Sequence, residues 1–413
     1  MSLSDDLAWR GLIKDKTFDS NKWLDTPKAF YWGVDCSSDS LTIGNLAPLM
    51  LARRLADAGW KPILLVGGAT SLIGDPGGKD EERPLLSRET VQHNVDAIKQ
   101  QVARLFGGKQ FTPADNYEWF KDVGYLEFLR DIGKHFSVTE LMQRDFVAER
   151  IGEDGTGISY AEFSYSLIQG YDYWKLYSQH KTELQIGGSD QWGNMLSGVS
   201  LIRKKESKEV HALSMPLVVN KATGKKFGKS EEGAVWLDTK KTSPFKFYQF
   251  WYNSSDKDAP DYLKIFTLLS KDKISELSES SQDSAQRIAQ KTLAYEVTAI
   301  VHGKDQADRQ KNISQALFGE AGIDTLSNDE IKEIKGEIPN LTVQPGTPTI
   351  EAIVKTSLAS SNSEARRLSQ SKAIYVNNQQ FSNDHLEAGD FKNGRLMIRR
   401  GKAYKDSALI ELG

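Results

Sequence analysis

The sequence predicts an α/β fold in three parts: a Rossmann-like domain on a parallel sheet, an all-helical domain, and a small α+β domain at the end. Near the start of the chain, two apolar segments with the length and composition of buried strands flank a helical pattern. Helical spacing then dominates residues 243–319, and residues 350–413 return to mixed patterning. Strand, helix and parallel strand form a right-handed crossover, so ligands are expected at the carboxyl ends of the strands.

The elements of this first crossover can be placed from the residues. Residues 29–34 (AFYWGV) and 62–66 (PILLV) read as strands, and helical spacing runs over 46–55. Pro48 falls within this spacing, and proline is tolerated only in the first turn of a helix. The helix is therefore predicted to begin near Gly44.

Changes in composition suggest where the domains end. Residues 236–322 are helical and rich in aromatic side chains, whereas 323–347 are polar, with prolines towards their end. A polar stretch of this kind is typical of a linker. The predicted division is a Rossmann-like domain at 1–235, a helical domain at 236–322, a linker at 323–347 and a small domain at 348–413.

The small domain has a readable local pattern. Residues 361–364 (SNSE) carry the signature of a capping box that opens a helix. A strand at 373–376 precedes a turn at 377–378 (NN), and residues 395–400 and 408–412 form a hairpin.

Basic side chains of the small domain could share one face. Such a cluster suggests contact with the phosphate backbone of a nucleic acid. Acidic neighbours reduce the positive charge of this face, and an ordinary solvated surface explains the basic residues equally well. The basic residues are Arg366, Arg367, Lys372, Arg399, Arg400, Lys402 and Lys405.

Composition excludes several classes of protein. With 53 basic and 56 acidic side chains, overall charge does not indicate nucleic-acid binding, which would need a local patch. The single cysteine, Cys36, excludes a disulfide framework and a cysteine-based zinc site. No basic and apolar leader opens the chain, and no apolar run approaches the ~18 residues of a membrane span. We expect a cytoplasmic protein without a bound metal, although Mg²⁺ could accompany a nucleotide.

Two common nucleotide-binding motifs are absent. No Gly-x-Gly-x-x-Gly follows the first strand, which argues against a nicotinamide-dependent dehydrogenase. Residues 228–230 (GKS) resemble the end of a P-loop, but Thr223 stands where that motif requires glycine.

Two other segments nevertheless indicate phosphate chemistry. Residues 226–230 (KFGKS) place two lysines three residues apart on a glycine-hinged segment, which could close over a polyanion as negative charge develops. Residues 35–45 lead into the first helix with small hydroxyl side chains and Gly44, and amide groups at a helix start can bind an anion. A solvated surface turn and a plain helix cap are the respective alternatives.

Polar side chains also follow the predicted strands. Asp75 lies in a glycine-rich segment after the second strand and is a candidate partner for an ammonium group. Tyr165, Gln169 and Asp172 are spaced so that one helical face presents all three. Burying them without a polar ligand would be costly, although polar groups also occur in ordinary helix packing. Asp190 follows another strand and could accept hydrogen bonds from ribose hydroxyls.

With these segments the chain resembles a bacterial-type tyrosyl-tRNA synthetase, a class I aminoacyl-tRNA synthetase, along essentially its whole length. The small domain resembles the S4-type RNA-binding module of that family. The resemblance implies a tyrosine–tRNA ligase that activates L-tyrosine with ATP and transfers it to the 3′-terminal ribose of tRNA(Tyr). The motifs that carry it, in the family's order, are 66–70 (VGGAT), 74–76 (GDP), 190–194 (DQWGN), 226–230 (KFGKS) and 242–251 (TSPFKFYQFW).

The resemblance also implies roles for single residues. Tyr31 and Asp172 would bind the phenolic hydroxyl of tyrosine. The rest of the tyrosine site, around its ammonium and carboxylate groups, would be Asp75, Tyr165, Gln169 and Gln191. The residues implied for ATP are Asp35, Ser37, Gly44, Gly188, Asp190 and Lys229. Those implied for catalysis, through contacts with phosphate groups, are Thr42, Asn45, Lys79, Arg83, Lys226, Lys229 and Ser230.

These roles agree with the chemistry of the reaction. A carboxylate that attacks the α-phosphate is already ionised near neutral pH and needs no general base. Catalysis then depends on positioning and on positive charge, which donors and lysines supply.

Thr42 and Asn45 depart from the family's first phosphate motif, which is usually His-Ile-Gly-His. Thr42 removes a ring donor from the developing phosphate charge, and loss of one such donor can cost ~3 kcal/mol. We expect slower tyrosine activation than in members with both histidines, or compensation by the lysines. Trp32 and Cys36 stand where the family commonly has a small residue and proline, which affects the expected ribose contacts.

Two related functions are weighed against this one. A tryptophanyl-tRNA synthetase shares the scaffold, but Tyr31 with Asp172 suits a phenol rather than an indole. A catalytically weakened, synthetase-like RNA-binding protein is suggested by Thr42, although the other site residues are intact.

The resemblance further implies a homodimer. Apolar residues around Phe128, Ile132 and Phe136 could supply the interface, but a buried internal helix would have the same pattern.

Overall fold

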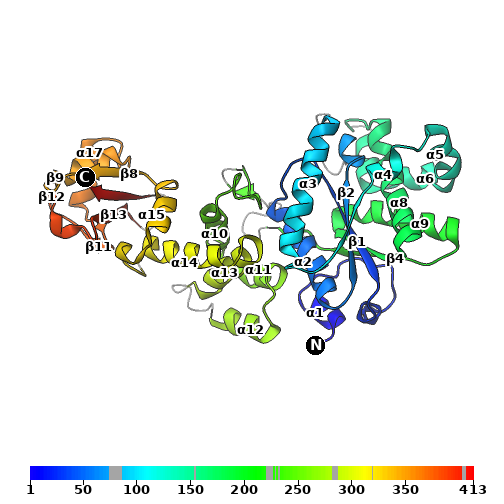
Figure 1. The fold of residues 1–413 in the computed structure, drawn as a ribbon, viewed down its shortest axis with the longest axis horizontal. Coiled ribbons are helices and arrows are strands. Elements are labelled where there is room, and N and C mark those ends of the chain that lie inside the picture. The colour runs from blue at the N-terminus through cyan, green and yellow to red at the C-terminus, as the bar shows by residue number, and fades with distance from the viewer. Residues whose placement is uncertain are drawn as a thin grey trace. The chain divides into compact units, whose positions relative to one another are not determined.

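The chain is divided by its internal contacts into two compact units. The first comprises Met1–Ser243 with Phe250–Val301, and the second Pro244–Gln249 with His302–Gly413. The computed structural model (Figure 1) describes residues 1–73, 86–152, 155–219, 227, 229–230, 233–280, 287–318, 320–401 and 406–413.

The first unit is built on a five-stranded parallel sheet in the order β3-β2-β1-β4-β5. Its two central predicted strands are confirmed and parallel, as a crossover requires. The chain order reverses beside β1, and in open α/β sheets such a switch point is where ligands bind. The strands are β1 (Ala29–Asp35), β2 (Lys61–Gly67), β3 (Thr112–Asp115), β4 (Thr182–Gly188) and β5 (His211–Met215).

Helices cover both faces of this sheet (Figure 1). α2 (Ile43–Asp57) and α3 (Arg88–Leu105) lie on one side, and α8 (Tyr160–His180) and α9 (Trp192–Glu206) on the other. Because side chains alternate along a strand, Tyr31 joins the core under α8 and α9, whereas its neighbours in β1 point towards α2.

The helix after β1 begins one residue before the predicted Gly44. Pro48 lies inside α2 rather than in its first turn, so the carbonyl group of Gly44 receives no N–H from that position.

Shorter elements complete the first unit. Its remaining helices and strands are α1 (Leu3–Trp9), α4 (Tyr117–Phe120), α5 (Tyr125–Asp131), α6 (Val138–Met142), α7 (Asp145–Ile151), β6 (Lys229–Ser230), β7 (Gly233–Ala234), α11 (Ala259–Phe266) and α12 (Lys271–Ser280). Single turns of 3₁₀ helix occur at Asn21–Asp25, Thr70–Leu72, Gly133–His135 and Ser189–Gln191.

The predicted helical segment is helical, but it does not form a compact unit of its own. Besides α11 and α12 it contains α10 (Pro244–Tyr252), α13 (Ile288–His302) and α14 (Lys304–Phe318). The start of α10 and all of α14 belong to the second unit, where Phe245 packs against Ile313 and Leu317. The domain boundary predicted at 322 is therefore not where the chain divides.

The predicted linker at 323–347 is wrong as a description of local structure. It contains α15 (Asn328–Lys335) and β8 (Asn340–Val343). Ser327 and Glu330 form a reciprocal capping box at the start of α15, and Ile331 and Ile334 are buried. The polar residues between these isoleucines hid an apolar stripe with helical spacing.

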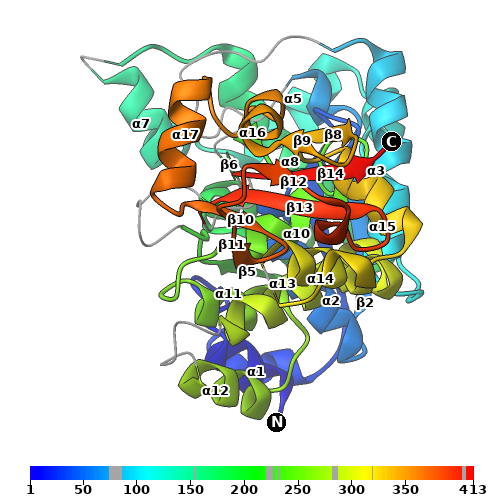
Figure 2. The same ribbon diagram turned by 90° about the vertical axis from the view of Figure 1, so that its left-hand side faces the viewer.

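The second unit ends in a five-stranded sheet in the order β11-β10-β13-β14-β8, and Figure 2 shows β13 and β14 side by side with α16 and α17 beside them. The predicted hairpin and the turn at Asn377 and Asn378 are confirmed, and both asparagines have positive φ. The elements are β9 (Thr347–Pro348), α16 (Thr349–Lys355), α17 (Asn362–Gln370), β10 (Ile374–Val376), β11 (Gln379–Gln380), β12 (His385–Leu386), β13 (Arg395–Arg400) and β14 (Ser407–Leu412).

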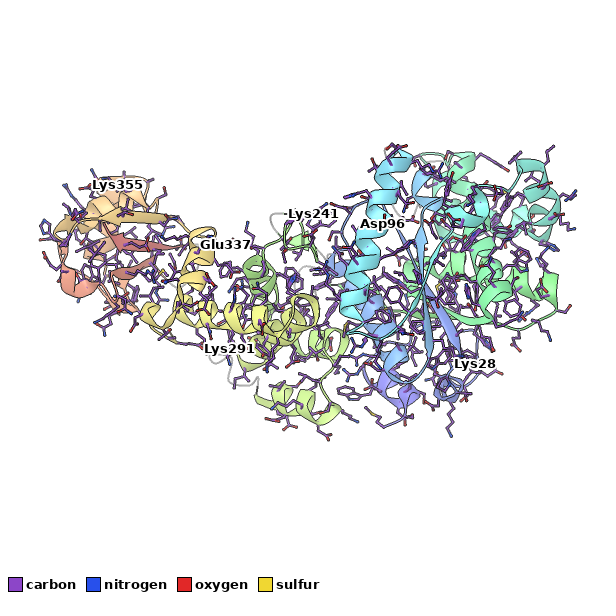
Figure 3. All side chains as sticks on the ribbon, viewed as in Figure 1. Lys28, Asp96, Lys241, Lys291, Glu337 and Lys355 are labelled. Atoms are coloured by element: carbon purple, nitrogen blue, oxygen red, sulfur yellow. The ribbon has the colours of Figure 1, made fainter. Side chains whose placement is uncertain are left out.

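Charged side chains lie on the surface of each unit, as Asp96 and Lys241 in the first and Lys355 in the second illustrate (Figure 3). Among the helices of the described residues, none has the length and apolar character needed to cross a membrane. The fold-class prediction is confirmed: a parallel α/β sheet, a helical stretch and a small final sheet.

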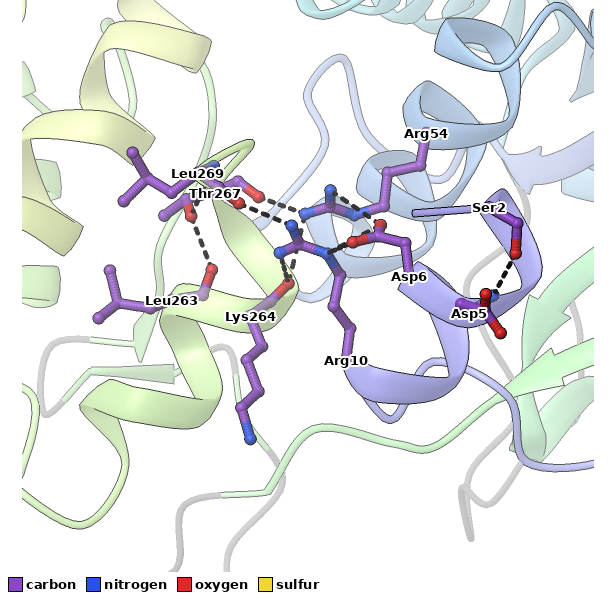
Figure 4. A network of polar contacts seen from close by, with 9 residues as sticks. All are labelled: Ser2, Asp5, Asp6, Arg10, Arg54, Leu263, Lys264, Thr267 and Leu269. Atoms are coloured by element: carbon purple, nitrogen blue, oxygen red, sulfur yellow. Dashed lines mark hydrogen bonds and ion pairs between the residues drawn. The ribbon is translucent and has the colours of Figure 1, made fainter. Parts of the chain in front are cut away.

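A buried polar network joins three helices of the first unit (Figure 4). Asp6 on α1 accepts a hydrogen bond from Arg10 Nε at 2.8 Å, and its carboxylate lies 3.8 Å from Arg54 on α2. Arg10 also donates to the carbonyl oxygens of Lys264 and Leu269 at 2.8 and 2.7 Å, and Arg54 donates to that of Thr267. The two guanidinium groups thereby bind carbonyl groups at the end of α11, which have no partners within the helix.

Cys36, just after β1, is fully buried. Its backbone N–H donates to Ser71 Oγ at 2.6 Å, and its carbonyl accepts from Asn94 Nδ2 at 2.8 Å. Burial raises the pKa of the Cys36 thiol to about 12, so this thiol is packed as a small apolar group.

Candidate active site

Tyr31 and Asp172 lie in the core between the sheet and α8. Asp172 is 2% exposed, and burial raises the pKa of its carboxyl group to about 8. The pKa of Tyr31 is raised well above its ordinary value, first by burial and then by the charge of Asp172. The two residues implied for one end of the tyrosine site are therefore close enough to interact electrostatically. Within the described ranges, the buried Tyr31 hydroxyl makes no hydrogen bond.

Two residues that sequence reasoning missed hold Asp172 in place. Trp119 Nε1 donates to one carboxylate oxygen at 2.8 Å, and Asn116 Nδ2 donates to the other at 3.1 Å. Asn116 is fixed in turn, because its Oδ1 accepts from the backbone N–H of Ala69 at 2.7 Å. Both residues follow β3, a short strand that contains a proline and did not stand out in the sequence.

The face of α8 that was read from the sequence is present. A capping box at Ser159 and Glu162 opens the helix, and an ion pair of 2.9 Å between Arg150 and Glu162 fixes its start. Tyr165 is buried like Asp172, whereas Gln169, between them in sequence, is half-buried. Tyr31, Tyr165 and Asp172 of the expected tyrosine site are thus all buried, and Gln169 is half-buried.

Asp35, implied for ATP, also contacts Tyr165 of the implied tyrosine site. Its carboxylate accepts from Tyr165 Oη at 3.0 Å and from Thr70 Oγ1 at 2.7 Å. A Cβ atom on Gly67 would collide with both Thr70 and Asp35, so this contact requires glycine at the end of β2. Asp35 therefore orients Tyr165 in this structure.

The residues that follow β4 are also linked by side-chain hydrogen bonds. Gln191 Oε1 accepts from Asn194 Nδ2 at 3.2 Å, and Asn194 Oδ1 accepts from Ser166 Oγ of α8 at 2.7 Å. A Cβ atom on Gly188 would lie 2.5 Å from Asp190 Oδ1, so a larger residue there would displace the exposed Asp190 side chain. Asp190 is exposed at this end of the sheet, where a ribose could reach it.

The start of α2 has a defined donor arrangement. The backbone N–H and the hydroxyl group of Thr42 both donate to Asn45 Oδ1, at 3.0 and 3.1 Å. Because a backbone N–H can only donate, the atom it meets must be the amide oxygen. Thr42 therefore donates its hydroxyl proton to the side-chain oxygen of Asn45. The NH₂ group of Asn45 takes no part in this contact. Ser37, in the preceding loop, is exposed.

The segment after the predicted lysine loop is bonded to the start of α2. Ile43 N donates to Val235 O at 3.0 Å, and Leu237 N donates to Leu41 O at 2.8 Å. The loop backbone also reaches this place, because a Cβ atom on Gly44 would lie 3.9 Å from Phe227 O. The two segments expected to bind phosphate are thus neighbours.

Several predicted residues lie outside the described residues, as do the side chains of Lys229 and Ser230, whose backbone forms β6. The residues outside are Asp75, Lys79, Arg83, Lys226, Lys402 and Lys405.

The basic residues of the second unit do not all share one face. Arg366, Arg367 and Lys372 are exposed. Arg400 reaches towards α17, where it bonds to Glu364 at 3.4 Å, whereas Arg399 lies over the ring of Tyr375 at 5.1 Å. Consecutive residues of a strand point to opposite faces, so Arg399 is separated from Arg400. The expectation of a single face is wrong for Arg399.

The expected interface residues are internal. Ile132 is 2% exposed, and Phe128 and Phe136 pack against the core around Tyr171. Other apolar side chains are exposed on the same group of helices, α5 to α8. They are Tyr125, Leu126, Val138, Met142, Ile151 and Tyr160.

Two family models match the chain. The model described as class I tRNA synthetases (W and Y) matches residues 24–319, and the model described as the tyrosine–tRNA ligase SYY-like C-terminal domain matches residues 330–405. A tyrosine–tRNA ligase of Streptococcus suis is 43% identical over 416 residues, which cover 97% of this chain and 98% of that protein. A tyrosine–tRNA ligase of Roseiflexus castenholzii is 42% identical and covers 98% of both chains.

Solved structures give the same likeness. A C-terminally truncated mitochondrial tyrosyl-tRNA synthetase of Aspergillus nidulans matches with a TM-score of 0.69 and 30% identity, over 77% of this chain and 94% of that one. The corresponding truncated enzyme of Coccidioides posadasii matches with a TM-score of 0.65 and 28% identity, over 76% and 91%.

Proposed function

The chain belongs to the class I tyrosyl-tRNA synthetases, ATP-dependent tyrosine–tRNA ligases, and from this premise we propose which of its residues carry out the reaction. In the first step, L-tyrosine attacks the α-phosphate of ATP, which gives tyrosyl-adenylate and pyrophosphate. In the second, tyrosine passes to the 3′-terminal ribose of tRNA(Tyr).

The buried pair of Tyr31 and Asp172 carries the assignment of the tyrosine site. Asp172 is held by Asn116 and Trp119, so its position is set before any ligand arrives. A phenolic hydroxyl between Asp172 and Tyr31 would satisfy the Tyr31 hydroxyl, which otherwise has no hydrogen bond among the described residues. Phenylalanine and an indole lack a phenolic oxygen and would leave the buried Tyr31 hydroxyl unpaired.

At the other end of the site, the start of α2 and the lysine loop would hold the phosphates. The Asn45 amide supplies donors whose direction is fixed by Thr42. Lys226, Lys229 and Ser230 would add charge and donors as pyrophosphate departs, with Lys79 and Arg83 also gripping it. Gly188 and Asp190 would hold the ribose. Tyr165, Gln169 and Asp75 would hold the ammonium of tyrosine, with Gln191 at its carboxylate.

Mg²⁺ is proposed to accompany ATP. Across the described ranges, no cluster of three His, Cys, Asp or Glu side chains could hold a metal ion. Mg²⁺ commonly keeps several waters and binds substrate phosphates with one or two carboxylates, which fits a site of this kind. The ion would neutralise part of the triphosphate charge. A cytoplasmic location remains a prediction.

Tyrosine-dependent exchange of pyrophosphate into ATP tests the proposed function. Exchange with tyrosine and little with phenylalanine or tryptophan is expected. Exchange that prefers tryptophan would reject the tyrosine site, and no exchange with any of the three would favour the synthetase-like RNA-binding alternative.

Thr42→His is expected to raise the rate of tyrosyl-adenylate formation. It restores a ring donor at the first phosphate motif, and such a donor can contribute ~3 kcal/mol to the transition state. Single-turnover formation of the adenylate measures the rate, with Thr42→Ser as the control that keeps the hydroxyl bonded to Asn45. A rate for Thr42→His at or below that of the unchanged chain contradicts the expectation.

The exposed arginines of α17 are proposed to contact the tRNA backbone. Replacing both Arg366 and Arg367 with alanine is expected to weaken tRNA binding and to reduce the slope of log affinity against log salt by about 1 to 2. Filter binding over a salt series measures both. Lys355→Ala is the control, because Lys355 is paired with Glu351 at 2.6 Å on α16 of the same unit. An unchanged slope for the double variant would remove this surface from the RNA site. Arg399, Arg400 and Lys372 remain predicted RNA contacts.

A homodimer is proposed through the exposed apolar side chains of α5 to α8. Leu126 is 78% exposed and Tyr125 62%, and exposed apolar groups gathered on one region often mark an interface. Sedimentation at micromolar concentration should give a dimer, and Leu126→Glu should shift it towards monomer. A monomeric unchanged chain would contradict the proposal.

A further inference from the structure

The ring of Phe227 is seated among four aromatic side chains of the first unit. Its centroid lies 5.0 Å from that of Tyr262, 5.2 Å from Phe266, and 5.5 Å from both Phe250 and Trp251. These rings come from α10 and α11, and Phe227 is only 9% exposed. We call the four rings around Phe227 (Phe250, Trp251, Tyr262 and Phe266) the aromatic nest.

The backbone of Phe227 is placed at the same time. Its N–H donates to Val218 O at 3.0 Å, and its carbonyl oxygen lies beside Gly44 at the start of α2, 3.9 Å from where a Cβ atom on that glycine would be. Phe227 follows Lys226 directly and precedes Lys229 by two residues. One buried side chain therefore fixes residue 227, directly after Lys226 and beside the first phosphate motif.

We propose that Phe227 is a positioning residue for tyrosine activation: the aromatic nest anchors the lysine loop so that Lys226 and Lys229 can reach the phosphates of ATP. This inference rests on the proposed function, because it requires those lysines to act on phosphate. Phe227 itself touches no reacting atom. Its contribution is to hold the backbone at residue 227, directly after Lys226 and two residues before Lys229, in one place.

The anchor has a specific kinetic consequence. A lysine displaced by about 1 Å from its place in the transition state can cost about 100-fold in rate. The tyrosine site at Tyr31 and Asp172 is built from other elements, so tyrosine binding without ATP should not depend on the anchor. Loss of the ring should therefore lower the activation rate and leave tyrosine affinity unchanged.

Three measurements on Phe227→Ala test the proposal, two of which do not depend on catalysis. Trypsin cleavage after Lys226 and Lys229 under native conditions, followed by mass spectrometry, should be roughly 10-fold faster than in the unchanged chain, because proteolysis reports local opening. The rate of pyrophosphate exchange at saturating tyrosine should fall roughly 10- to 100-fold. The dissociation constant of tyrosine, from equilibrium dialysis without ATP, should stay the same.

Two further variants separate positioning from stability. Phe227→Met should recover most of the exchange rate and of the resistance to trypsin, because methionine fills apolar gaps and makes favourable contacts with aromatic rings. Phe106→Ala removes a ring that is 3% exposed and packs at a tilt against the ring of Phe111, which is not part of the nest. It should lower the melting temperature without speeding cleavage at the two lysines.

The outcomes distinguish the anchor from the function on which it rests. Cleavage and exchange equal to those of the unchanged chain would overturn the anchor, as would a Phe227→Ala variant that also loses tyrosine binding. An unchanged chain without exchange activity would reject the proposed function, and the cleavage comparison would still decide whether Phe227 holds the loop.

Discussion

Asp172→Asn is expected to lower kcat/KM for tyrosine by roughly 10- to 100-fold and to leave KM for ATP nearly unchanged. Both oxygens of the Asp172 carboxylate accept a hydrogen bond, from Asn116 and from Trp119. An asparagine has only one oxygen, so its NH₂ group would face one of these buried donors. Each unsatisfied buried donor costs ~1–3 kcal/mol, and 1.4 kcal/mol corresponds to about a factor of ten.

Pyrophosphate exchange at a range of tyrosine concentrations and a range of ATP concentrations measures kcat/KM for tyrosine and KM for ATP separately. Asp96→Asn makes the same chemical change at an exposed position of α3 and should have no effect. An equal rise in both KM values would mean that Asp172 supports the fold as a whole rather than the tyrosine site.

The same substitution should also alter how stability depends on pH. Burial raises the pKa of the Asp172 carboxyl group to about 8, above its value in the unfolded chain of about 3.9. An acidic group whose pKa is raised in the folded protein contributes stability that is fully present below its unfolded pKa. This stability is lost as pH rises through its folded pKa. Between pH 5 and pH 9, urea unfolding should therefore show a smaller loss of stability for Asp172→Asn than for the unchanged chain.

Asp6→Ala is expected to destabilise the first unit by about 3 kcal/mol. It removes the carboxylate that lies against both Arg10 and Arg54 in Figure 4, and these two side chains, 3% and 6% exposed, lose the counter-charge that they share. Breaking a buried ion pair in this way costs ~3–5 kcal/mol, and the lower end applies because Asp6 is 20% exposed.

Urea or thermal unfolding measures the loss. Asp5→Ala is the matched control, since Asp5 is the adjacent carboxylate on α1 and is exposed. Equal stability of the two variants would show that the carbonyl groups at the end of α11 are sufficient partners for the arginines.

Much of the site could be predicted because its residues sit on strongly periodic elements. The strand that carries Tyr31 and the helix that carries Tyr165 and Asp172 are long and well patterned, and their residues are brought together by the parallel sheet. Asn116 and Trp119 were missed because they follow a strand of four residues, and their role depends on a partner far along the chain.

Other features that the sequence left open or hid have equally local causes. The stripe of α15 was hidden by the charged residues between its isoleucines, so a helix was read as a linker. The pattern of Phe128, Ile132 and Phe136 does not say which neighbour covers them, and the neighbour is the core of the same chain. The role proposed for Phe227 depends on the aromatic nest. The residues of this nest lie between 250 and 266, outside the motif at 226–230, so the motif alone could not predict it.

The packing of Cys36 has a practical consequence. Maleimides and iodoacetamides react with exposed thiolates. The thiol of Cys36 is fully buried, and because its pKa is raised to about 12 it stays protonated at any pH suitable for labelling. A cysteine introduced on the surface, for example beside the nest, would then be the one reactive position. Fluorescent or spin probes could follow the lysine segment during turnover without a prior cysteine-free background.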